Sequence, residues 1–365
     1  MERLRNRAGF ILALMLGLAI VGIIVALNNP ALIAWRILTS KPEYIVLAAL
    51  FDLVSIVFYA LAWIVTARAL GLRMSVEDGI VASILGLFAD KLVASASISC
   101  EAVRIAYIKS KYEDISYEEL VATIMVHRFL YNAAFISLIL AAFIDLTLSG
   151  YAPQILGVLL ALAVVSTIVA SYVLVRPESL KGLASRITPR VEVGLSRILR
   201  RNPIRLSGRL NEFIDGISRS VKKASGRKPH MLLAAVLMIL QWVAGAAEFY
   251  SVFAAVGHKV SLWVALLVFP MHCFLTALPV GLPAALGVVE AGTLFMLVAF
   301  GVDGATAMAV TLITRGVEVW FEIALALLII AMVGLKEYGP QLLKYAEELA
   351  AAKAPFLAQG FQEDC

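Results

Sequence analysis

The chain contains 365 residues, of which 61% are hydrophobic and 16% charged, and its formal net charge at pH 7 is +5. This is the composition of a membrane protein, and it excludes a soluble catalytic domain and a nucleic-acid-binding module. The cysteines are Cys100, Cys273 and Cys365. The first two lie in apolar segments, so they predict neither a disulfide framework nor a zinc site.

Apolar runs long enough to cross about 30 Å of hydrocarbon recur along the chain. They predict membrane-spanning helices over residues 8–27, 43–70, 116–148, 152–175, 230–256 and 304–335. The first run begins with basic residues but has no small-residue cleavage site after it, which favours a retained helix over a signal peptide. Two further apolar blocks, residues 76–111 and 260–301, are interrupted.

The longest polar stretch, residues 176–229, contains fourteen Lys or Arg and four acidic residues. An excess of Lys and Arg marks cytoplasmic loops, so this stretch and the basic N-terminus are predicted to lie in the cytoplasm. Aliphatic residues recur at helical spacing from 206 to 221, which predicts an amphipathic helix on the membrane surface. Its basic face either only marks topology or also attracts anionic lipid headgroups.

Matching the chain to itself reveals an internal repeat. Glu101 and Glu290 each stand in a Glu-Ala pair after small residues, and Arg128 and Arg315 follow them at 27 and 25 residues. The segments that end in these arginines, VATIMVHR and MAVTLITR, align without gaps, and upstream ARALGLRMS matches FAAVGHKVS. The repeat therefore covers roughly residues 43–148 and 231–336.

The predicted topology gives the two copies opposite orientations, which is typical of transporters with a midplane site at the repeat interface. Each interrupted block must then enter the membrane and return, so each is predicted to be a re-entrant helical hairpin. Non-helical backbone at that depth has to be buried in protein or to face a water-filled cavity. The residues expected to break the second hairpin are Pro279, Gly281, Pro283 and Gly287.

Charges inside the membrane cost at least ~2.5–3.5 kcal/mol each, so the matched pairs predict a polar cavity that holds an anion. Arginine suits phosphate because its planar fork donates two parallel hydrogen bonds. The predicted substrate-binding residues are Glu101, Arg104, Arg128, Glu290 and Arg315. Secondary candidates are Asp90, Lys91, His127, Glu248 and His272. The alternative is structural: a buried Glu–Arg pair would pin the hairpin to its helix, and the histidines would be hydrogen-bonded interior residues.

The segment PAALGVVEA at 283–291, followed by Gly301 and Arg315, resembles the PGGLGVxE signature of the flippase-like integral membrane family. That family includes the transmembrane domain of lysylphosphatidylglycerol synthases. Cys100-Glu101-Ala-Val-Arg104 is similar to its GE-x-x-R element. The chain departs from the pattern at Ala284-Ala285, where the family has a double glycine, at Cys100, where it has glycine, and at Ala94, where it has proline. The resemblance covers roughly residues 8–336 and implies movement of a lipid between leaflets.

The expected architecture is therefore an all-α polytopic membrane protein with an inverted repeat and two re-entrant hairpins. Its predicted parts are residues 1–42, 43–175, 176–229 (cytoplasmic linker), 230–336 (second repeat) and 337–365 (cytoplasmic tail). The expected function is transport of an anionic, phosphate-bearing lipid in the cell membrane, without catalysis, cofactor or metal. Expected partners are a phospholipid or polyprenyl-phosphate-linked lipid and a separate glycosyltransferase or lipid synthase. A transporter of a small soluble anion, or an accessory protein or enzyme acting on a lipid-linked glycan, remains the alternative.

Overall fold

The computed structural model describes residues 2–92, 97–151, 153–176, 206–278, 280 and 282–334. Contacts divide the chain into two compact units, Met1–Phe321 and Glu322–Cys365. All the predicted substrate-binding residues lie in the first unit. In the second unit the described residues, 322–334, are helical, and the predicted tail at 337–365 lies outside the described residues. The described residues form helices and connecting turns without β-strands, which confirms the all-α prediction.

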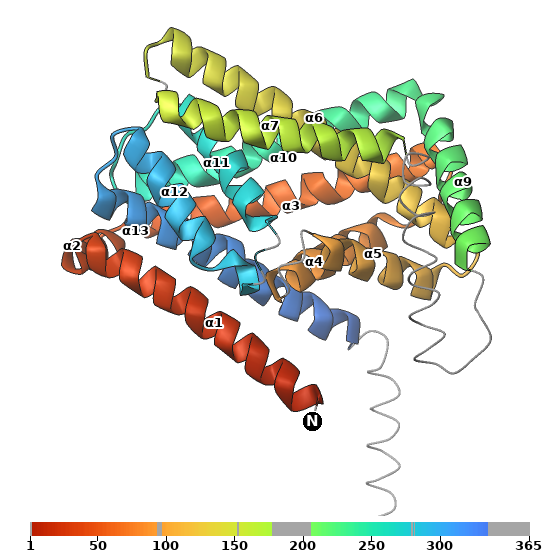
Figure 1. Ribbon diagram of the computed structural model, residues 1–365, viewed down its shortest axis with the longest axis horizontal. Helices are drawn as coiled ribbons and strands as arrows, with labels where there is room; N and C mark the ends of the chain where they lie inside the picture. Colours follow the sequence, from red (N-terminus) through yellow and green to blue (C-terminus); the bar gives the residue numbers. More distant parts are fainter. Residues whose placement is uncertain are drawn as a thin grey trace, which may run out of the picture. The chain divides into compact units, whose positions relative to one another are not determined.

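The helices of the first unit follow the apolar runs of the sequence (Figure 1). In chain order they are α1 (Glu2–Leu27), α2 (Pro30–Leu38), α3 (Pro42–Leu70), α4 (Val76–Leu92), α5 (Ile98–Lys111), α6 (Tyr117–Leu148), α7 (Gln154–Val175), α9 (Leu206–Ser225), α10 (Lys228–Ala255), α11 (Leu262–Thr276), the 3₁₀ turn η2 (Pro283–Ala285), α12 (Val288–Ala299), α13 (Gly304–Arg315) and the π-helical η3 (Gly316–Phe321).

Local chemistry explains where several of these helices begin and end. Ser116 and Glu119 form a capping box at the start of α6, and Asp303 accepts a hydrogen bond from the Thr306 amide at the start of α13. Proline at the first position opens α2 and α3. Gly71 closes α3 with a φ of 96°, a left-handed conformation that favours glycine.

Four described helices are long and apolar enough to cross a membrane: Pro42–Leu70, Tyr117–Leu148, Lys228–Ala255 and Gly304–Gly334. They confirm four of the predicted spans. The predicted span at 8–27 forms α1, which bends by 97° into α2, and the stretches Ile11–Leu27 and Pro30–Leu38 reach the length and hydropathy of a membrane span only as a pair. The predicted span at 152–175 forms α7, whose Ile155–Val169 stretch belongs to the shorter apolar helices.

Both interrupted blocks fold into two helical limbs. The first forms α4 and α5, which pack against each other. A Cβ on Gly86 of α4 would lie 2.8 Å from the carbonyl oxygen of Cys100, so glycine permits the close approach. The second block forms α11, η2 and α12. Pro283 begins η2, and Gly287 precedes α12 with a φ of 87°. Pro279 and Gly281 lie outside the described residues.

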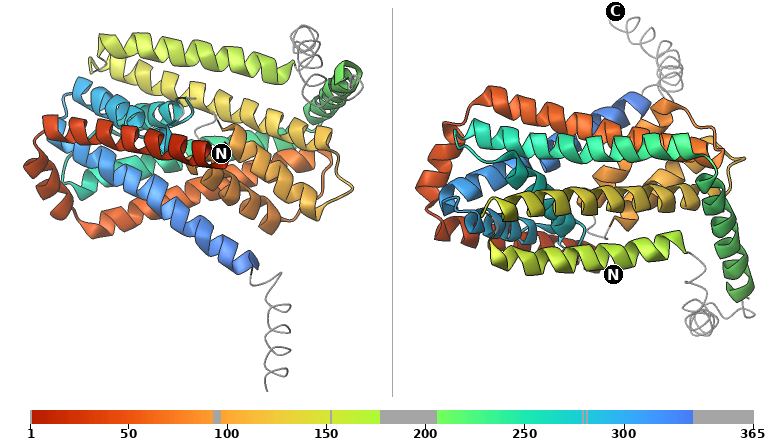
Figure 2. Two further views of the ribbon diagram at one scale, coloured as in Figure 1. Left: turned by 60° about the horizontal axis from the view of Figure 1, so that its bottom comes forward. Right: turned by 90° about the horizontal axis from the view of Figure 1, so that it is seen from above.

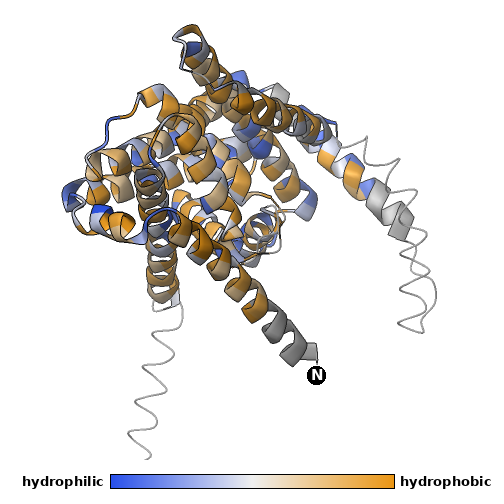
Figure 3. Ribbon diagram, turned by 60° about the vertical axis from the view of Figure 1, so that its left-hand side comes forward, coloured by the Kyte–Doolittle hydropathy of each residue, from blue (hydrophilic) through white to orange (hydrophobic). Residues whose placement is uncertain are grey.

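The long helices α3 and α10 pack side by side and form the centre of the first unit, and α6 contacts both (Figure 2). Large aromatic side chains of these helices are buried, including Tyr59 on α3 and Trp242 and Phe249 on α10. Apolar residues dominate the helices (Figure 3). Large apolar side chains are also exposed on them, for example Leu12, which is 72% exposed. Such surfaces are expected of helices that face lipid.

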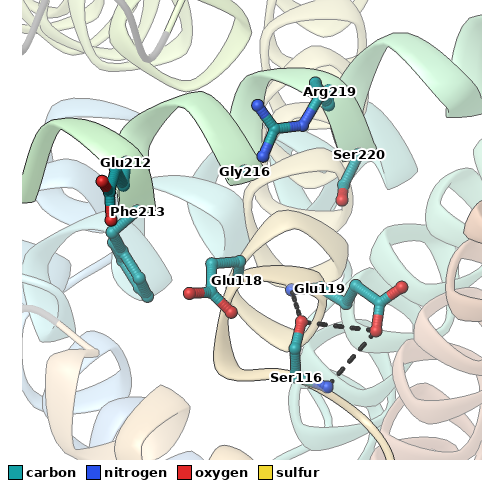
Figure 4. Close-up of a pocket in the computed structure, with 8 residues that line it drawn as sticks. All are labelled: Ser116, Glu118, Glu119, Glu212, Phe213, Gly216, Arg219 and Ser220. Carbon is teal, nitrogen blue, oxygen red and sulfur yellow. Dashed lines mark hydrogen bonds between the residues drawn. The ribbon is translucent and has the colours of Figure 1, made fainter. Parts of the chain in front are cut away.

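The predicted amphipathic helix is present as α9, and Ile214 and Ile217 on its apolar side are buried. Helix α9 packs against the start of α6, where a Cβ on Gly216 would lie 3.0 Å from the Cγ of Glu118. A surface pocket of about 840 Å³ lies at this junction (Figure 4). None of the predicted substrate-binding residues lines it, and its Glu119 is occupied by the capping box with Ser116.

Candidate functional site

The first predicted pair forms a cluster of three charged side chains. Arg128 on α6 donates from Nε to Oε1 of Glu101 on α5, with 2.6 Å between the atoms. Arg104, one turn after Glu101, donates from Nη1 to Oε2 of the same carboxylate at 2.8 Å. A single carboxylate therefore bridges two guanidinium groups. We call Glu101, Arg104 and Arg128 the first cluster.

Arg104 is fully buried and is held by aromatic side chains of α3. Its guanidinium carbon lies 3.8 Å from the ring centroid of Trp63, and Nη1 also donates to the Tyr59 hydroxyl at 3.1 Å. The Trp63 indole nitrogen in turn donates to Thr123 of α6 at 3.0 Å. This cation–π contact partly offsets the cost of burying the charge. Neither Tyr59 nor Trp63 was predicted as a site residue, because their sequence contexts are ordinary apolar runs.

The second predicted pair also forms. Arg315 at the end of α13 donates from Nε to Oε1 of Glu290 on α12 at 2.9 Å, and its Nη2 donates to the carbonyl oxygen of Ala284. The other Glu290 oxygen accepts from the amide of Gly287 at 2.6 Å. Glu290 therefore fixes the turn before its own helix as well as Arg315, and both side chains are almost completely buried.

Two further groups extend this pair into what we call the second cluster: Glu290, Arg315, Glu318 and His272. Glu318 of η3 lies 3.7 Å from Arg315 Nη1, and its Oε2 lies 2.7 Å from Nε2 of His272. The other ring nitrogen of His272 contacts the Thr293 hydroxyl at 2.7 Å. His272 is thus an interior histidine with both nitrogens bonded. Glu318 was not among the predicted substrate-binding residues, although its position three residues after Arg315 places both on one helix face, where Glu318 can neutralise the arginine locally.

The remaining secondary candidates lie in different settings. Asp90, near the end of α4, accepts hydrogen bonds from Ser97 at 3.1 Å and Ser99 at 3.0 Å. It therefore ties the end of the first limb to the start of the second. Lys91 is partly buried in the last turn of α4. Glu248 is completely buried on α10.

His127, the other secondary candidate, is fully buried on α6. Its Nε2 lies 3.1 Å from the Tyr59 carbonyl oxygen, and its ring packs edge-on against the Tyr59 ring. These contacts agree with the structural reading of this histidine.

The turn before Glu290 has unusual backbone geometry. Ala284 and Ala285 have φ values of 49° and 50°, in the left-handed region that costs an L-residue roughly 1–2 kcal/mol. These are the two positions at which the sequence departs from the double glycine of the resembled signature. The turn therefore keeps a conformation suited to glycine although alanine occupies it. Arg315 contributes to holding this turn by donating a hydrogen bond from Nη2 to the Ala284 carbonyl oxygen.

The chemistry that the two clusters offer is charge and hydrogen bonding. Among the described residues, no group of three or more His, Cys, Asp or Glu side chains could hold a metal ion. Buried guanidinium groups can bind a carboxylate or a phosphate in the same way, because both anions accept paired N–H donors. An anion that enters must compete with the resident glutamates.

Comparison with known proteins places the chain in a family. Residues 10–326 match the lysylphosphatidylglycerol synthase TM region. A UPF0104 membrane protein of Methanothermobacter thermautotrophicus is 24% identical over 322 residues, covering 88% of this chain and 94% of that protein. A UPF0104 membrane protein of Pyrococcus horikoshii is 25% identical over 288 residues, covering 76% and 83%. The chain is therefore a multi-pass membrane protein that belongs to the lysylphosphatidylglycerol synthase TM region family.

Proposed function

We propose that the protein moves a phosphate-bearing anionic lipid between the leaflets of the cell membrane. The observation that carries this proposal is two Glu–Arg contacts, the partly buried Glu101–Arg128 and the buried Glu290–Arg315, in a chain built of membrane-spanning helices. Buried charges in such helices are costly and mark substrate pathways in membrane proteins. The headgroup would pass the clusters while the acyl or isoprenoid tail stays in the bilayer.

We further propose that residues 43–148 and 231–336 are inverted repeats. Gly71 and Gly257, which end α3 and follow α10, are 186 residues apart. Ser55 and Gln241 are also 186 residues apart, and they hydrogen-bond to each other at 3.2 Å across the α3–α10 interface. Contact between equivalent positions is what a two-fold axis between the copies would produce. The axis would run between α3 and α10.

The short limbs support the proposal of two re-entrant hairpins. Helices α5 and α12 have 14 and 12 residues, and α4 and α11 have 17 and 15. At 1.5 Å per residue these are about 18–26 Å long, less than the ~30 Å of hydrocarbon. A limb of this length would end inside the bilayer. Each hairpin turn, with Glu101 or Glu290 close to it, would then lie near the midplane. The basic linker and the N-terminus would be cytoplasmic.

No chemical step is part of this proposal, and transport would be downhill or ion-coupled. Two rival functions share the same site. A transporter of a small soluble anion would use the arginines without a lipid tail. An accessory protein or enzyme would act with a separate glycosyltransferase or lipid synthase on a lipid-linked glycan.

The test is lipid translocation in vesicles reconstituted with purified protein. Fluorescent phospholipid and labelled polyprenyl phosphate are compared in separate vesicles for the unmodified protein, Glu290→Gln and Arg315→Ala. Arg68→Ala, which removes an exposed arginine at the end of α3, is the control. The proposal expects transfer that Arg68→Ala preserves and the two site variants abolish. Absence of transfer for both lipids by the folded, unmodified protein would overturn it.

A further inference from the structure

We infer that the first cluster is the phosphate subsite, and that the Glu101 carboxylate occupies the phosphate position in the ligand-free protein. This inference rests on the proposed function for its choice of a lipid phosphate. The two carboxylate oxygens of Glu101 each accept from a different arginine, Arg128 at 2.6 Å and Arg104 at 2.8 Å. A phosphate group presents the same kind of paired oxygen acceptors, so it can replace the carboxylate between the two guanidinium groups.

The charge of the first cluster favours an incoming anion. It holds two guanidinium groups and one carboxylate, an excess of one positive charge. Asp90 on α4, which accepts hydrogen bonds from Ser97 and Ser99, is a negative charge near the first cluster. In the second cluster Arg315 faces both Glu290 and Glu318, and the charge of Lys91 also acts on Glu318. An anion entering a low-dielectric region gains most where positive charge is in excess.

Arg104 has hydrogen-bonding capacity that the ligand-free structure does not use. Its side chain is completely buried, yet Nε and Nη2 have no hydrogen-bond partner. An unpaired buried donor costs free energy, and a ligand oxygen that reaches one removes that cost. The stacked rings of Trp63 and Tyr59 hold the guanidinium in place without consuming these donors.

The first cluster is also the more accessible of the two. The Glu101 and Arg128 side chains are 15% and 19% exposed, whereas Glu290 and Arg315 are 2% and 6% exposed. Displacing Glu101 breaks two side-chain contacts and no backbone contact. Displacing Glu290 instead breaks its bond to the Gly287 amide, which fixes the hairpin turn. The second cluster is therefore a brace that holds the second hairpin, and the first cluster can exchange its carboxylate.

The excess of one positive charge matches a ligand with one negative charge at the phosphate. A phosphodiester, as in a glycerophospholipid headgroup, meets this condition, and so does singly charged inorganic phosphate. Phosphomonoesters and diphosphates carry more charge, and together with the displaced but still ionised Glu101 they would leave the cluster net negative. The chemistry assigned to the subsite is thus a phosphate monoanion.

The test is a measurement of ligand binding to the protein in nonionic detergent. Binding is monitored by the change in fluorescence of Trp63, which lies beside Arg104. The ligand is short-chain phosphatidylglycerol, with the corresponding diacylglycerol as the phosphate-free control and inorganic phosphate as the free anion. Trp63→Phe identifies the part of the signal that comes from the cluster. Melting temperatures establish that each variant is folded.

We expect Arg128→Gln and Arg104→Gln to weaken phosphatidylglycerol binding at least about tenfold, the value of one charged hydrogen bond. Glu101→Gln removes the competing carboxylate charge and should tighten binding by about tenfold. Arg68→Gln, at an exposed arginine outside both clusters, should leave affinity within about threefold. Arg315→Gln should lower the melting temperature. If Arg104→Gln does not fold, the affinities of Arg128→Gln and Glu101→Gln, at partly exposed positions, still test the inference.

Weaker or unchanged binding by Glu101→Gln would overturn the inference, as would an Arg68→Gln defect equal to that of Arg128→Gln. Binding of inorganic phosphate as tight as that of the lipid would keep the subsite and assign its ligand to the free anion. Transport that depends on Arg315 but not on Arg128 would refute this inference while leaving the proposed function standing. Binding without any lipid transfer would support this inference and overturn the proposed function.

Discussion

Ile20 of α1 lies directly against Gly287, the residue before α12. A Cβ on Gly287 would stand 2.8 Å from the Cβ of Ile20, and the φ of Gly287 is 87°. One turn away, a Cβ on Gly17 would stand 2.8 Å from the Cβ of Leu286. The N-terminal helix is thus packed on the turn whose Gly287 amide binds Glu290, so the second cluster depends on α1.

Replacing Gly287 by alanine should destabilise the protein by about 1–3 kcal/mol, because the new Cβ meets both a left-handed backbone and Ile20. Thermal unfolding in detergent measures the effect. Gly22→Ala is the matched control, since a Cβ there meets nothing within 4 Å and its helix gains up to ~1 kcal/mol from alanine. Equal melting temperatures for the two variants would show that α1 does not press on the turn.

Breaking the second cluster should reveal strong coupling between its members. Glu290→Gln leaves Arg315 buried with only Glu318 at 3.7 Å, and should cost about 3–5 kcal/mol. The double variant Glu290→Gln/Arg315→Gln should be less destabilised than the sum of the two single variants by more than about 1 kcal/mol. A double-mutant cycle on unfolding free energies checks this. Simple additivity would contradict the direct ion pair.

The left-handed alanines before α12 offer a stabilising change. Ala284→Gly and Ala285→Gly each remove an unfavourable Cβ at positive φ, and each should raise the unfolding free energy by up to about 1 kcal/mol. Ala161→Gly, at an exposed position within α7, is the control and should lower stability by roughly the same amount. Thermal unfolding of the three variants suffices, and a loss of stability at 284 and 285 would argue against the left-handed turn.

The open end of the first hairpin should be sensitive to acid. Asp78 at the start of α4 accepts hydrogen bonds from Ser75 at 2.6 Å and Tyr112 at 2.8 Å, and lies 3.1 Å from the Lys111 ammonium. Burial by itself would raise the pKa of Asp78, but these hydrogen bonds and the Lys111 charge outweigh it and hold the pKa below its ordinary value of 3.8.

Because the folded-state pKa is depressed, this stabilisation is present above pH 3.8 and is lost as the pH falls through the folded pKa. Melting temperatures of the unmodified protein should therefore fall below that pH. Asp78→Asn should be less stable at neutral pH and should lose that part of the acid dependence. An identical acid profile for both proteins would show that other carboxylates govern the transition.

The sequence alone identified the membrane class, the long spans and the two Glu–Arg pairs. It could do so because apolar length and helical pattern are local properties, and because charges stand out in apolar runs. The contact between Glu290 and Arg315 is the one that the structural alternative described. The left-handed backbone at Ala284 and Ala285, where the resembled signature has glycines, was not predicted.

The tertiary structure decided how the charges are shared. That Arg104 stacks on Trp63 and reaches Tyr59, 45 residues earlier, follows from the packing of α5 against α3 and α6. That Glu318 joins His272, 46 residues earlier, follows from the packing of η3 and α11. These contacts depend on the relative positions of whole helices, which no local pattern specifies. They make one cluster net positive and accessible and the other closed, although the two sequence motifs look alike.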